Sequence, residues 1–212
     1  MMSKTKESAI ILLSGGLDSY VSLDISSHTY KIPLALTFDY GQIAIKDEIN
    51  ASRKIAKKYG IDHKIIKLPF LAQMCNDTTN DIWIPNRNGL FLNIAGCFCD
   101  KYKINGIIFG ANIEEAENFS DNSIDFIKNA QKALSYSTKN NPKIIAPLIK
   151  MTKFETISYG IENNLDFSLI KSCYNSKEKT EKKHCGKCPS CKLLKAAVQK
   201  AKREDLLKIL GF

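Results

Sequence analysis

Short apolar runs alternate with amphipathic segments over the first 150 residues, and this alternation leaves few folds open to the chain. Buried strands are predicted at 9–13, 33–38, 63–68, 106–111 and 143–146. Helices are predicted between them, from about Asp18, over 44–59 with Gly60 as the C-cap, and over 89–102. Strands that alternate with helices indicate an α/β fold in which helices flank a parallel sheet.

The alternation stops near residue 150. Thr152 and Glu155 have the spacing of a capping box, which predicts a helix from there to about residue 164. Two terminal helices are predicted at 191–202 and 205–210. We therefore expect an α/β domain at 1–150 and a small helical region at 151–212.

Composition and charge narrow the classes of protein. With 212 residues, 44% of them hydrophobic and 25% charged, the chain can bury a full core. The apolar run at 9–13 is far shorter than a membrane span or a signal-peptide core, so we expect a cytosolic protein without membrane contact. Residues 171–212 contain 12 Lys or Arg and 4 Asp or Glu. Such a basic tail leaves direct tRNA binding open, although lysine-rich helices are more often solvated faces.

The string Ser14-Gly15-Gly16-Leu17-Asp18-Ser19 lies between the first predicted strand and the first predicted helix. Open α/β sheets bind nucleotide phosphates at this position, and glycines let backbone N–H groups approach an anion. Asp18 is suited to hold Mg²⁺ or to cap the helix rather than to bind phosphate. The string lacks the lysine of a Walker loop and the spacing of a dinucleotide fingerprint. A plain strand-to-helix turn is the alternative.

This string resembles the SGGxDS loop of the ATP pyrophosphatase (PP-loop) family. The resemblance implies that domain 1–150 binds ATP and that ATP is cleaved between its α- and β-phosphates. A substrate oxygen then takes AMP, and a nucleophile displaces AMP. The nucleotide-binding residues implied at the loop are Leu13, Ser14, Gly15, Gly16, Leu17, Asp18 and Ser19.

Seven cysteines cannot all pair within one chain, and four of them have metal-site spacing. This spacing predicts a closed Zn²⁺ site with four thiolate ligands, Cys173, Cys185, Cys188 and Cys191. An iron–sulfur cluster is the alternative, as is replacement of one ligand by His184. Of the others, Cys97 and Cys99 are expected on different faces of a helix and in the core, whereas Cys75 lies in a polar loop.

Further motifs follow the loop in one order over nearly the whole chain. They are Phe38-Asp39-Tyr40-Gly41-Gln42, Pro85-Asn86-Arg87-Asn88 with Phe91-Leu92, Pro147-Leu148 with Lys153 and Glu155, and Cys173-Tyr174-Asn175 before the cysteine knuckle. Together they resemble the 7-cyano-7-deazaguanine synthase (QueC, preQ0 synthase) family. The resemblance implies a Rossmann-like adenine nucleotide alpha hydrolase fold, a structural Zn²⁺ and a homodimer. It also implies conversion of 7-carboxy-7-deazaguanine and ammonia to the nitrile preQ0, a queuosine or archaeosine precursor.

Roles for single residues follow from this resemblance and from charge. Adenylation builds negative charge at the α-phosphate, so the site needs Mg²⁺ and cations. Lys153 and Arg87 are the candidates, with Asp18 as the metal-facing carboxylate, and surface salt bridges are the alternative for both cations. The adenine is expected at Phe38, Tyr40 and Gln42, unless Phe38 is plain core. The deazapurine is expected at Arg87, Asn88 and Asp121.

The chain departs from the family pattern at three places. Ile43 and Ala44 follow Gln42 where Arg or His is frequent, residues 114–123 replace an SGYPDC segment, and Leu194 stands where arginine is usual. Two other functions therefore stay open. One is tRNA thiolation with Cys75 as the reactive thiol, and the other is a deazapurine- or nucleotide-binding component of a larger complex.

Overall fold

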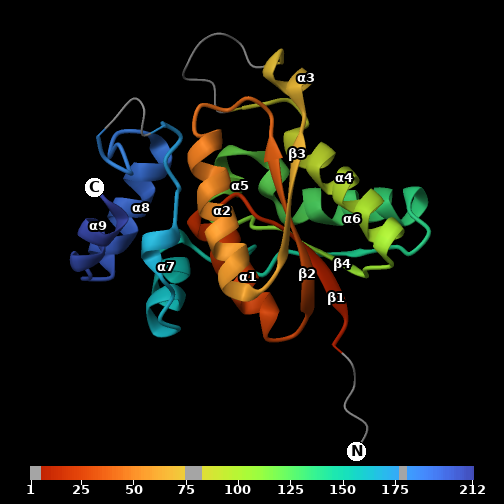
Figure 1. Ribbon diagram of the computed structural model, residues 1–212, viewed down its shortest axis with the longest axis horizontal. Helices are drawn as coiled ribbons and strands as arrows, with labels where there is room; N and C mark the ends of the chain where they lie inside the picture. The colour runs from red at the N-terminus through yellow and green to blue at the C-terminus, as the bar shows by residue number, and fades with distance from the viewer. Residues whose placement is uncertain (1–5, 75–82, 177–180) are drawn as a thin grey trace, which may run out of the picture.

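A five-stranded parallel sheet with helices on both faces forms the centre of the molecule (Figure 1). The computed structural model describes residues 6–74, 83–176 and 181–212. The strands are β1 (Ser8–Leu12), β2 (Lys31–Asp39), β3 (Asp62–Lys67), β4 (Gly106–Ile108) and β5 (Lys143–Ile145). Their order in the sheet is β3-β2-β1-β4-β5. The predicted parallel α/β architecture is confirmed, and each predicted strand is present with ends shifted by a few residues.

The helices follow the strands in the expected alternation. They are α1 (Leu17–Ser27), α2 (Ile45–Tyr59), α3 (Pro69–Ala72), α4 (Arg87–Tyr102), α5 (Ile113–Asn118), α6 (Ile124–Ser137), α7 (Lys153–Glu162), α8 (Pro189–Lys200) and α9 (Asp205–Leu210). Sequence analysis did not assign α3, α5 or α6. For α6 a signal existed, since Phe126, Ile127, Ala130 and Leu134 repeat at helical spacing and pack against the core.

Two hydrophobic clusters, one on each face of the sheet, hold these layers together. Alternate residues of β1 point to opposite faces, so Ala9 and Ile11 join one cluster whereas Ile10 and Leu12 join the other. The first cluster contains residues of α1, α2, α7, α8 and α9, and the second contains residues of α4 and α6. The C-terminal helices therefore share a core with α1. The domain division at residue 150 stays a prediction.

Local capping signals explain where two of the helices begin and end. Gly60 ends α2 in the left-handed conformation (φ 65°), as predicted. The predicted capping box is present at α7, where Thr152 Oγ1 accepts from Glu155 N at 3.2 Å and Glu155 Oε2 accepts from Thr152 N at 2.7 Å. This bond from the Thr152 N–H keeps the pKa of Glu155 below its ordinary value.

The strand order places the loop after β1 at the point where a ligand is expected. The chain moves from β1 outward to β2 and β3, and then returns to β4 on the other side of β1. Adjacent connections therefore leave β1 toward opposite faces, which opens a crevice at the carboxyl ends of the strands. Among the described residues, no helix is both long and apolar enough to cross a membrane.

The capping box provides a test of the local stability of α7. Thr152→Ala removes the side-chain acceptor of the Glu155 N–H and should lower the free energy of unfolding by about 1 kcal/mol in urea denaturation. Ser135→Ala, at an exposed position within α6, is the control and should change it by less than about 0.5 kcal/mol. Equal losses in the two variants would contradict the capping role.

Candidate active site

The PP-loop, residues 14–19, joins β1 to α1 in the predicted strand–loop–helix arrangement. Gly15 has a φ of +82°, and a Cβ there would lie 2.7 Å from Ala51 Cβ and 2.9 Å from Ser52 N. Only glycine fits this backbone against α2. Ser14 Oγ lies 3.1 Å from Ser19 Oγ, and Gly16 begins α1 without a side-chain cap. The loop therefore offers backbone and hydroxyl donors at a helix start, the arrangement that binds anions.

A cavity of about 910 Å³ opens over this loop. It brings together most of the residues that sequence analysis selected, namely Leu13, Ser14, Gly16, Leu17, Asp18, Ser19, Phe38, Tyr40, Gln42, Arg87, Asn88, Asp121 and Cys188. Gly15 and Lys153 are not part of its lining. Gly15 faces α2, and Lys153 lies beside Asp18. The volume is within the range of small-molecule sites.

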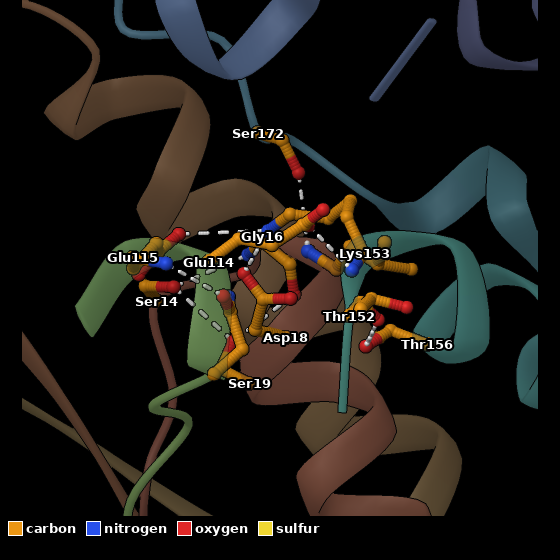
Figure 2. Close-up of polar contacts among 12 residues, drawn as sticks. Ser14, Gly16, Asp18, Ser19, Glu114, Glu115, Thr152, Lys153, Thr156 and Ser172 are labelled. Carbon is orange, nitrogen blue, oxygen red and sulfur yellow. Dashed lines mark hydrogen bonds and ion pairs between the residues drawn. The ribbon is translucent and has the colours of Figure 1, made fainter. Parts of the chain in front are cut away.

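Lys153 forms a buried ion pair with Asp18 (Figure 2). Its Nζ lies 2.5 Å from Asp18 Oδ2 and 3.5 Å from Glu115 Oε1, and only 6% of Lys153 is exposed. Burial alone would lower the pKa of Lys153, but the charges of Asp18 and Glu115 outweigh it and raise the pKa. A surface salt bridge is therefore wrong for this lysine. It is a permanent cation within a cluster of carboxylates.

One of the two carboxylates in this cluster, Asp18, has an incomplete set of partners. Asp18 Oδ1 is buried and has no hydrogen-bond partner among the described residues. Burial and the charge of Asp18 raise the pKa of Glu115, an effect that Lys153 opposes. One ammonium thus balances two carboxylates, which leaves the cluster one negative charge in excess. Oxygen ligands with spare negative charge suit a divalent cation.

Arg87 lies across the cavity at the start of α4, with its guanidinium 6.0 Å above the ring of Tyr40. Its Nε donates to Asn88 Oδ1 at 3.3 Å, and Asn88 Nδ2 donates to Asp121 O at 3.4 Å. Burial would lower the pKa of Arg87, but Tyr40 and Asp121 raise it. Among the described residues, Arg87 makes no ion pair with a carboxylate. It is a charged, half-buried group positioned to receive an anion.

Phe38, Tyr40 and Gln42 form one wall of the cavity at the end of β2. Phe38 stacks on Phe91 with ring centroids 4.0 Å apart, so this side chain belongs to the core as well as to the wall. Gln42 Oε1 accepts from Tyr40 N, while its Nε2 donates to Phe38 O at 3.0 Å and to Glu48 Oε2 at 2.8 Å. The Gln42 side chain thus holds the turn that follows β2 through backbone groups of Phe38 and Tyr40.

The four predicted metal ligands converge on one point. The sulfurs of Cys173, Cys185, Cys188 and Cys191 all lie within 4.8 Å of one another, and those of Cys185 and Cys191 are 3.9 Å apart. Four sulfurs on one tetrahedral Zn²⁺ would be about 3.8 Å apart. Backbone N–H groups of Asn175 and Cys185 donate to Cys173 Sγ, each at 3.4 Å. These residues fit a single metal ion held by thiolates.

The remaining sulfur and imidazole candidates are placed elsewhere. His184 is not a fifth candidate ligand, because its Nδ1 lies 2.6 Å from Leu210 O and its Nε2 accepts from Ser172 N at 3.1 Å. Burial lowers its pKa to about 4, so the ring is neutral. Cys99 is in the core as predicted, but Cys97 is exposed on the outer side of α4, which corrects that expectation. Cys75 lies outside the described residues.

Comparison with known proteins agrees with these motifs. A model of the family described as "Queuosine biosynthesis protein QueC" matches residues 8–81 and 72–202. The chain belongs to the QueC family. The 7-cyano-7-deazaguanine synthase of Methanosarcina barkeri is 37% identical over 96% of this chain and 99% of its own length. The enzyme of the same name from Carboxydothermus hydrogenoformans is 38% identical over 90% of this chain and 98% of its own length.

Solved structures place this QueC family member among proteins of one fold. The U34-tRNA thiolase NcsA from Methanococcus maripaludis with its [4Fe-4S] cluster has a TM-score of 0.57 at 18% identity, over 98% of this chain and 70% of that one. NH3-dependent NAD synthetase from Campylobacter jejuni has a TM-score of 0.52 at 18% identity, over 96% and 89% of the two chains. At these identities the likeness is one of fold, and it agrees with the predicted Rossmann-like α/β architecture.

Several residues of this QueC site were missed in the sequence. The cavity lining also includes Glu48, Glu115, Lys171, Ser172 and Tyr174. Glu115 lies in an acidic run that differs from the usual family segment, and Ser172 and Tyr174 flank the first cysteine, so position in a motif was the available signal. Burial raises the pKa of Tyr174 to about 12, which keeps its hydroxyl a hydrogen-bond donor. Lys171 had no signal, because it begins a lysine-rich tail.

Removing Lys153 should lower the free energy of unfolding by an amount that depends on pH. Lys153→Met leaves the carboxylates of Asp18 and Glu115 without their cation and should cost about 3–5 kcal/mol of unfolding free energy near neutral pH. Without the ammonium, the pKa of Glu115 should rise further above its unfolded value. A group with a raised folded pKa stabilises at low pH and loses that contribution as pH increases, so the deficit should be larger at pH 8 than at pH 5.

Denaturant titration of wild type and variant at both pH values measures this difference. The control is Lys128→Met, which removes an exposed ion pair with Asp125 and should cost less than about 1 kcal/mol at either pH. A Lys153→Met deficit that is the same at pH 5 and pH 8 would show that the carboxylates are not the cause.

The cysteine cluster makes a separate prediction about metal content and stability. Cys185→Ser should lose the bound metal and most of the folding energy that the closed site supplies, seen as a large drop in melting temperature. Cys97→Ser, at the exposed cysteine of α4, should retain both. Metal analysis and thermal melting of the two variants test this, and a Cys185→Ser protein with wild-type metal content would disprove the ligand assignment.

Proposed function

We propose that this chain is a 7-cyano-7-deazaguanine synthase, a ligase that converts 7-carboxy-7-deazaguanine and ammonia to 7-cyano-7-deazaguanine and cleaves ATP to AMP and pyrophosphate. The observation that carries the proposal is that the PP-loop, Arg87 and Asp121 meet in one cavity of a QueC family member. Full-length similarity to relatives that carry this enzyme name supports it. The homodimer and the cytosolic location expected from the sequence stay predictions.

The cavity has separate regions for the charges and rings of the two substrates. We place the β- and γ-phosphates of ATP on the PP-loop and the adenine against the wall formed by Phe38, Tyr40 and Gln42. We place the deazapurine near Asp121, whose side chain can accept from a ring N–H or amino group. Arg87 would bind the substrate carboxylate, because its guanidinium can donate two parallel bonds and meets no carboxylate of a described residue.

Two successive activations account for the chemistry. A carboxylate oxygen attacks the α-phosphate, pyrophosphate leaves, and ammonia then displaces AMP to give the amide. The amide oxygen attacks a second ATP at the α-phosphate, and loss of AMP and a proton leaves the nitrile. Both attacks place negative charge at the α-phosphate and on the departing pyrophosphate. The loop N–H groups would offset that charge, and Lys153 would balance the carboxylate of Asp18 beside them.

The proposed cofactors are Mg²⁺ and Zn²⁺. The buried Asp18 Oδ1 has no partner among the described residues, and Glu115 contacts Lys153, the same lysine that pairs with Asp18. These two carboxylates therefore fit an oxygen-ligated Mg²⁺. When bound there, Mg²⁺ would neutralise phosphate charge. The four converging thiolates fit Zn²⁺ with no open position for substrate, so its contribution is structural. In a [4Fe–4S] cluster each cysteine binds a different iron, which spreads the four sulfurs more widely than these.

The test is direct. The purified protein with MgATP, ammonium and 7-carboxy-7-deazaguanine should form the nitrile, detected by mass, with two AMP and two pyrophosphate released per nitrile. Asp18→Asn should reduce turnover by at least about a hundredfold while the protein stays folded, because the cluster loses the charge that faces the metal. Asp125→Asn, on the exposed side of α6, should leave turnover unchanged.

Three outcomes would contradict the proposal. ATP turnover that is independent of the carboxylate, or that yields ADP, would exclude this reaction. Tight binding of deazapurine without turnover would favour the alternative role as a binding component of a larger complex. Thiolation of tRNA gains no structural support, since Cys75 lies outside the described residues.

A further inference from the structure

We propose that Lys171 and Ser172, which directly precede Cys173, complete the phosphate-binding loop from the C-terminal part of the chain. Ser172 would donate its hydroxyl hydrogen to an oxygen of the β,γ-diphosphate of ATP and of the pyrophosphate product. Lys171 would act as a positioning residue that holds Ser172 and Gly15 in place. The inference rests on the proposed function for the identity of the ligand and adds residues outside the SGGLDS string to its binding site.

Two hydrogen bonds join this segment to the PP-loop. Lys171 N donates to Gly15 O at 2.8 Å, and Leu17 N donates to Ser172 Oγ at 3.1 Å. In Figure 2, Ser172 reaches toward the loop from the segment before the cysteines. The backbone at Gly16 lies just as close, since a Cβ there would be 3.7 Å from both Lys171 O and Ser172 Oγ. Residues 15–17 therefore contact the segment continuously.

The first of these bonds sets the direction of a phosphate donor. A trans peptide unit is planar, so its C=O and N–H point in opposite directions. When Lys171 N holds the carbonyl of Gly15, the N–H of Gly16 in the same peptide unit must point away from Lys171. That N–H donates to Ser14 Oγ at 3.3 Å, within the loop that lines the cavity. The position of Lys171 thus determines where one loop N–H can meet an anion.

The second bond leaves the Ser172 hydroxyl free to donate. A hydroxyl has two acceptor lone pairs and one donor hydrogen. Ser172 Oγ accepts from Leu17 N, and among the residues that the structure describes no acceptor takes its hydrogen. Ser172 is half-buried and lines the cavity beside Gly16 and Leu17. An acceptor-rich ligand on the loop is the natural partner for this hydrogen.

The side chain of Lys171 is fully engaged in contacts within the protein. Its side chain is 1% exposed, and Nζ lies 3.1 Å from Asp47 Oδ2 in α2. The same Nζ donates to Asn175 O at 2.8 Å and to Lys183 O at 2.9 Å. An ammonium has three N–H donors, so these contacts use all of them. Lys171 thus acts by position, since it ties α2 and the cysteine loop to the backbone that supports Gly15.

His184, which lies between Cys173 and Cys185 in the sequence, also contacts Ser172. His184 Nε2 accepts from Ser172 N at 3.1 Å, and the other ring nitrogen of His184 lies 2.6 Å from Leu210 O. Cys173 follows Ser172 directly and is a metal ligand by position. His184 and the end of α9 therefore contact the segment that touches the phosphate loop from its other side.

Isothermal titration of the metal-loaded protein with magnesium pyrophosphate and, separately, with AMP tests the inference. Ser172→Ala should weaken pyrophosphate binding about tenfold, the value of one hydrogen bond to a charged group, and leave AMP binding unchanged. Ser172→Thr keeps the hydroxyl and should restore binding to within about threefold of wild type. Ser168→Ala, at an exposed serine four positions upstream, is the matched control and should bind both ligands as wild type does.

Lys171→Met should lose at least as much pyrophosphate affinity as Ser172→Ala while it retains its metal and its AMP affinity. Metal analysis and melting temperature of each variant separate this result from general damage. Equal loss of AMP and pyrophosphate binding, or a Ser172→Ala protein that binds pyrophosphate as wild type does, overturns the inference and leaves the proposed function standing. A folded wild-type protein that binds no pyrophosphate overturns both.

Discussion

The ion pair between Lys153 and Asp18 joins the first turns of α7 and α1, which are 135 residues apart in the chain. The desolvation of a buried pair offsets much of its attraction, so its main effect is on geometry and charge rather than on net stability. It holds a cation beside the phosphate loop that cannot be lost by deprotonation at physiological pH. Because α1 and α7 also share a hydrophobic cluster, the pair can form only when the C-terminal helices are in place.

The same dependence runs through the cysteine loop. Its four cysteines have a structural role in our proposal, yet the segment directly before Cys173 contacts the PP-loop through two hydrogen bonds. A closed metal site is rigid because four bonds fix a short stretch of chain. Contact with such a site restricts the conformations that a glycine-containing loop can adopt. The metal site and the phosphate site are thus parts of one structure.

The cavity holds charged groups whose charges are not balanced within the protein. Arg87 faces the cavity with no carboxylate partner among the described residues, while Asp18 and Glu115 share one lysine near the PP-loop. Such arrangements cost stability and are kept where a charged ligand completes them. An anionic nucleotide with a divalent cation, together with a carboxylate substrate, would complete both sets of groups in the arrangement that we propose.

Patterns of local spacing in the sequence were sufficient to predict the sheet, the strand–loop–helix at residues 14–19, the capping box at Thr152 and the cysteine cluster. Each of these depends on residues that are close along the chain, so periodicity and motif spacing carry the signal. The helix α6 was missed although its apolar residues repeat at helical spacing. The exposure of Cys97 was misjudged, because burial depends on which neighbours cover a face. The alternative of a surface salt bridge for Lys153 failed for the same reason.

What the sequence by itself determined is the set of parts: an anion-binding loop after a first strand, four thiolates at metal spacing, and the order of motifs of the QueC family. Only the tertiary structure decided which distant side chains meet at the loop. Lys153, Glu115, Lys171 and Ser172 approach it because parallel strands bring their carboxyl ends to one edge and α7 packs beside α1. Contacts of this kind arise from packing across the fold, and no local spacing encodes them.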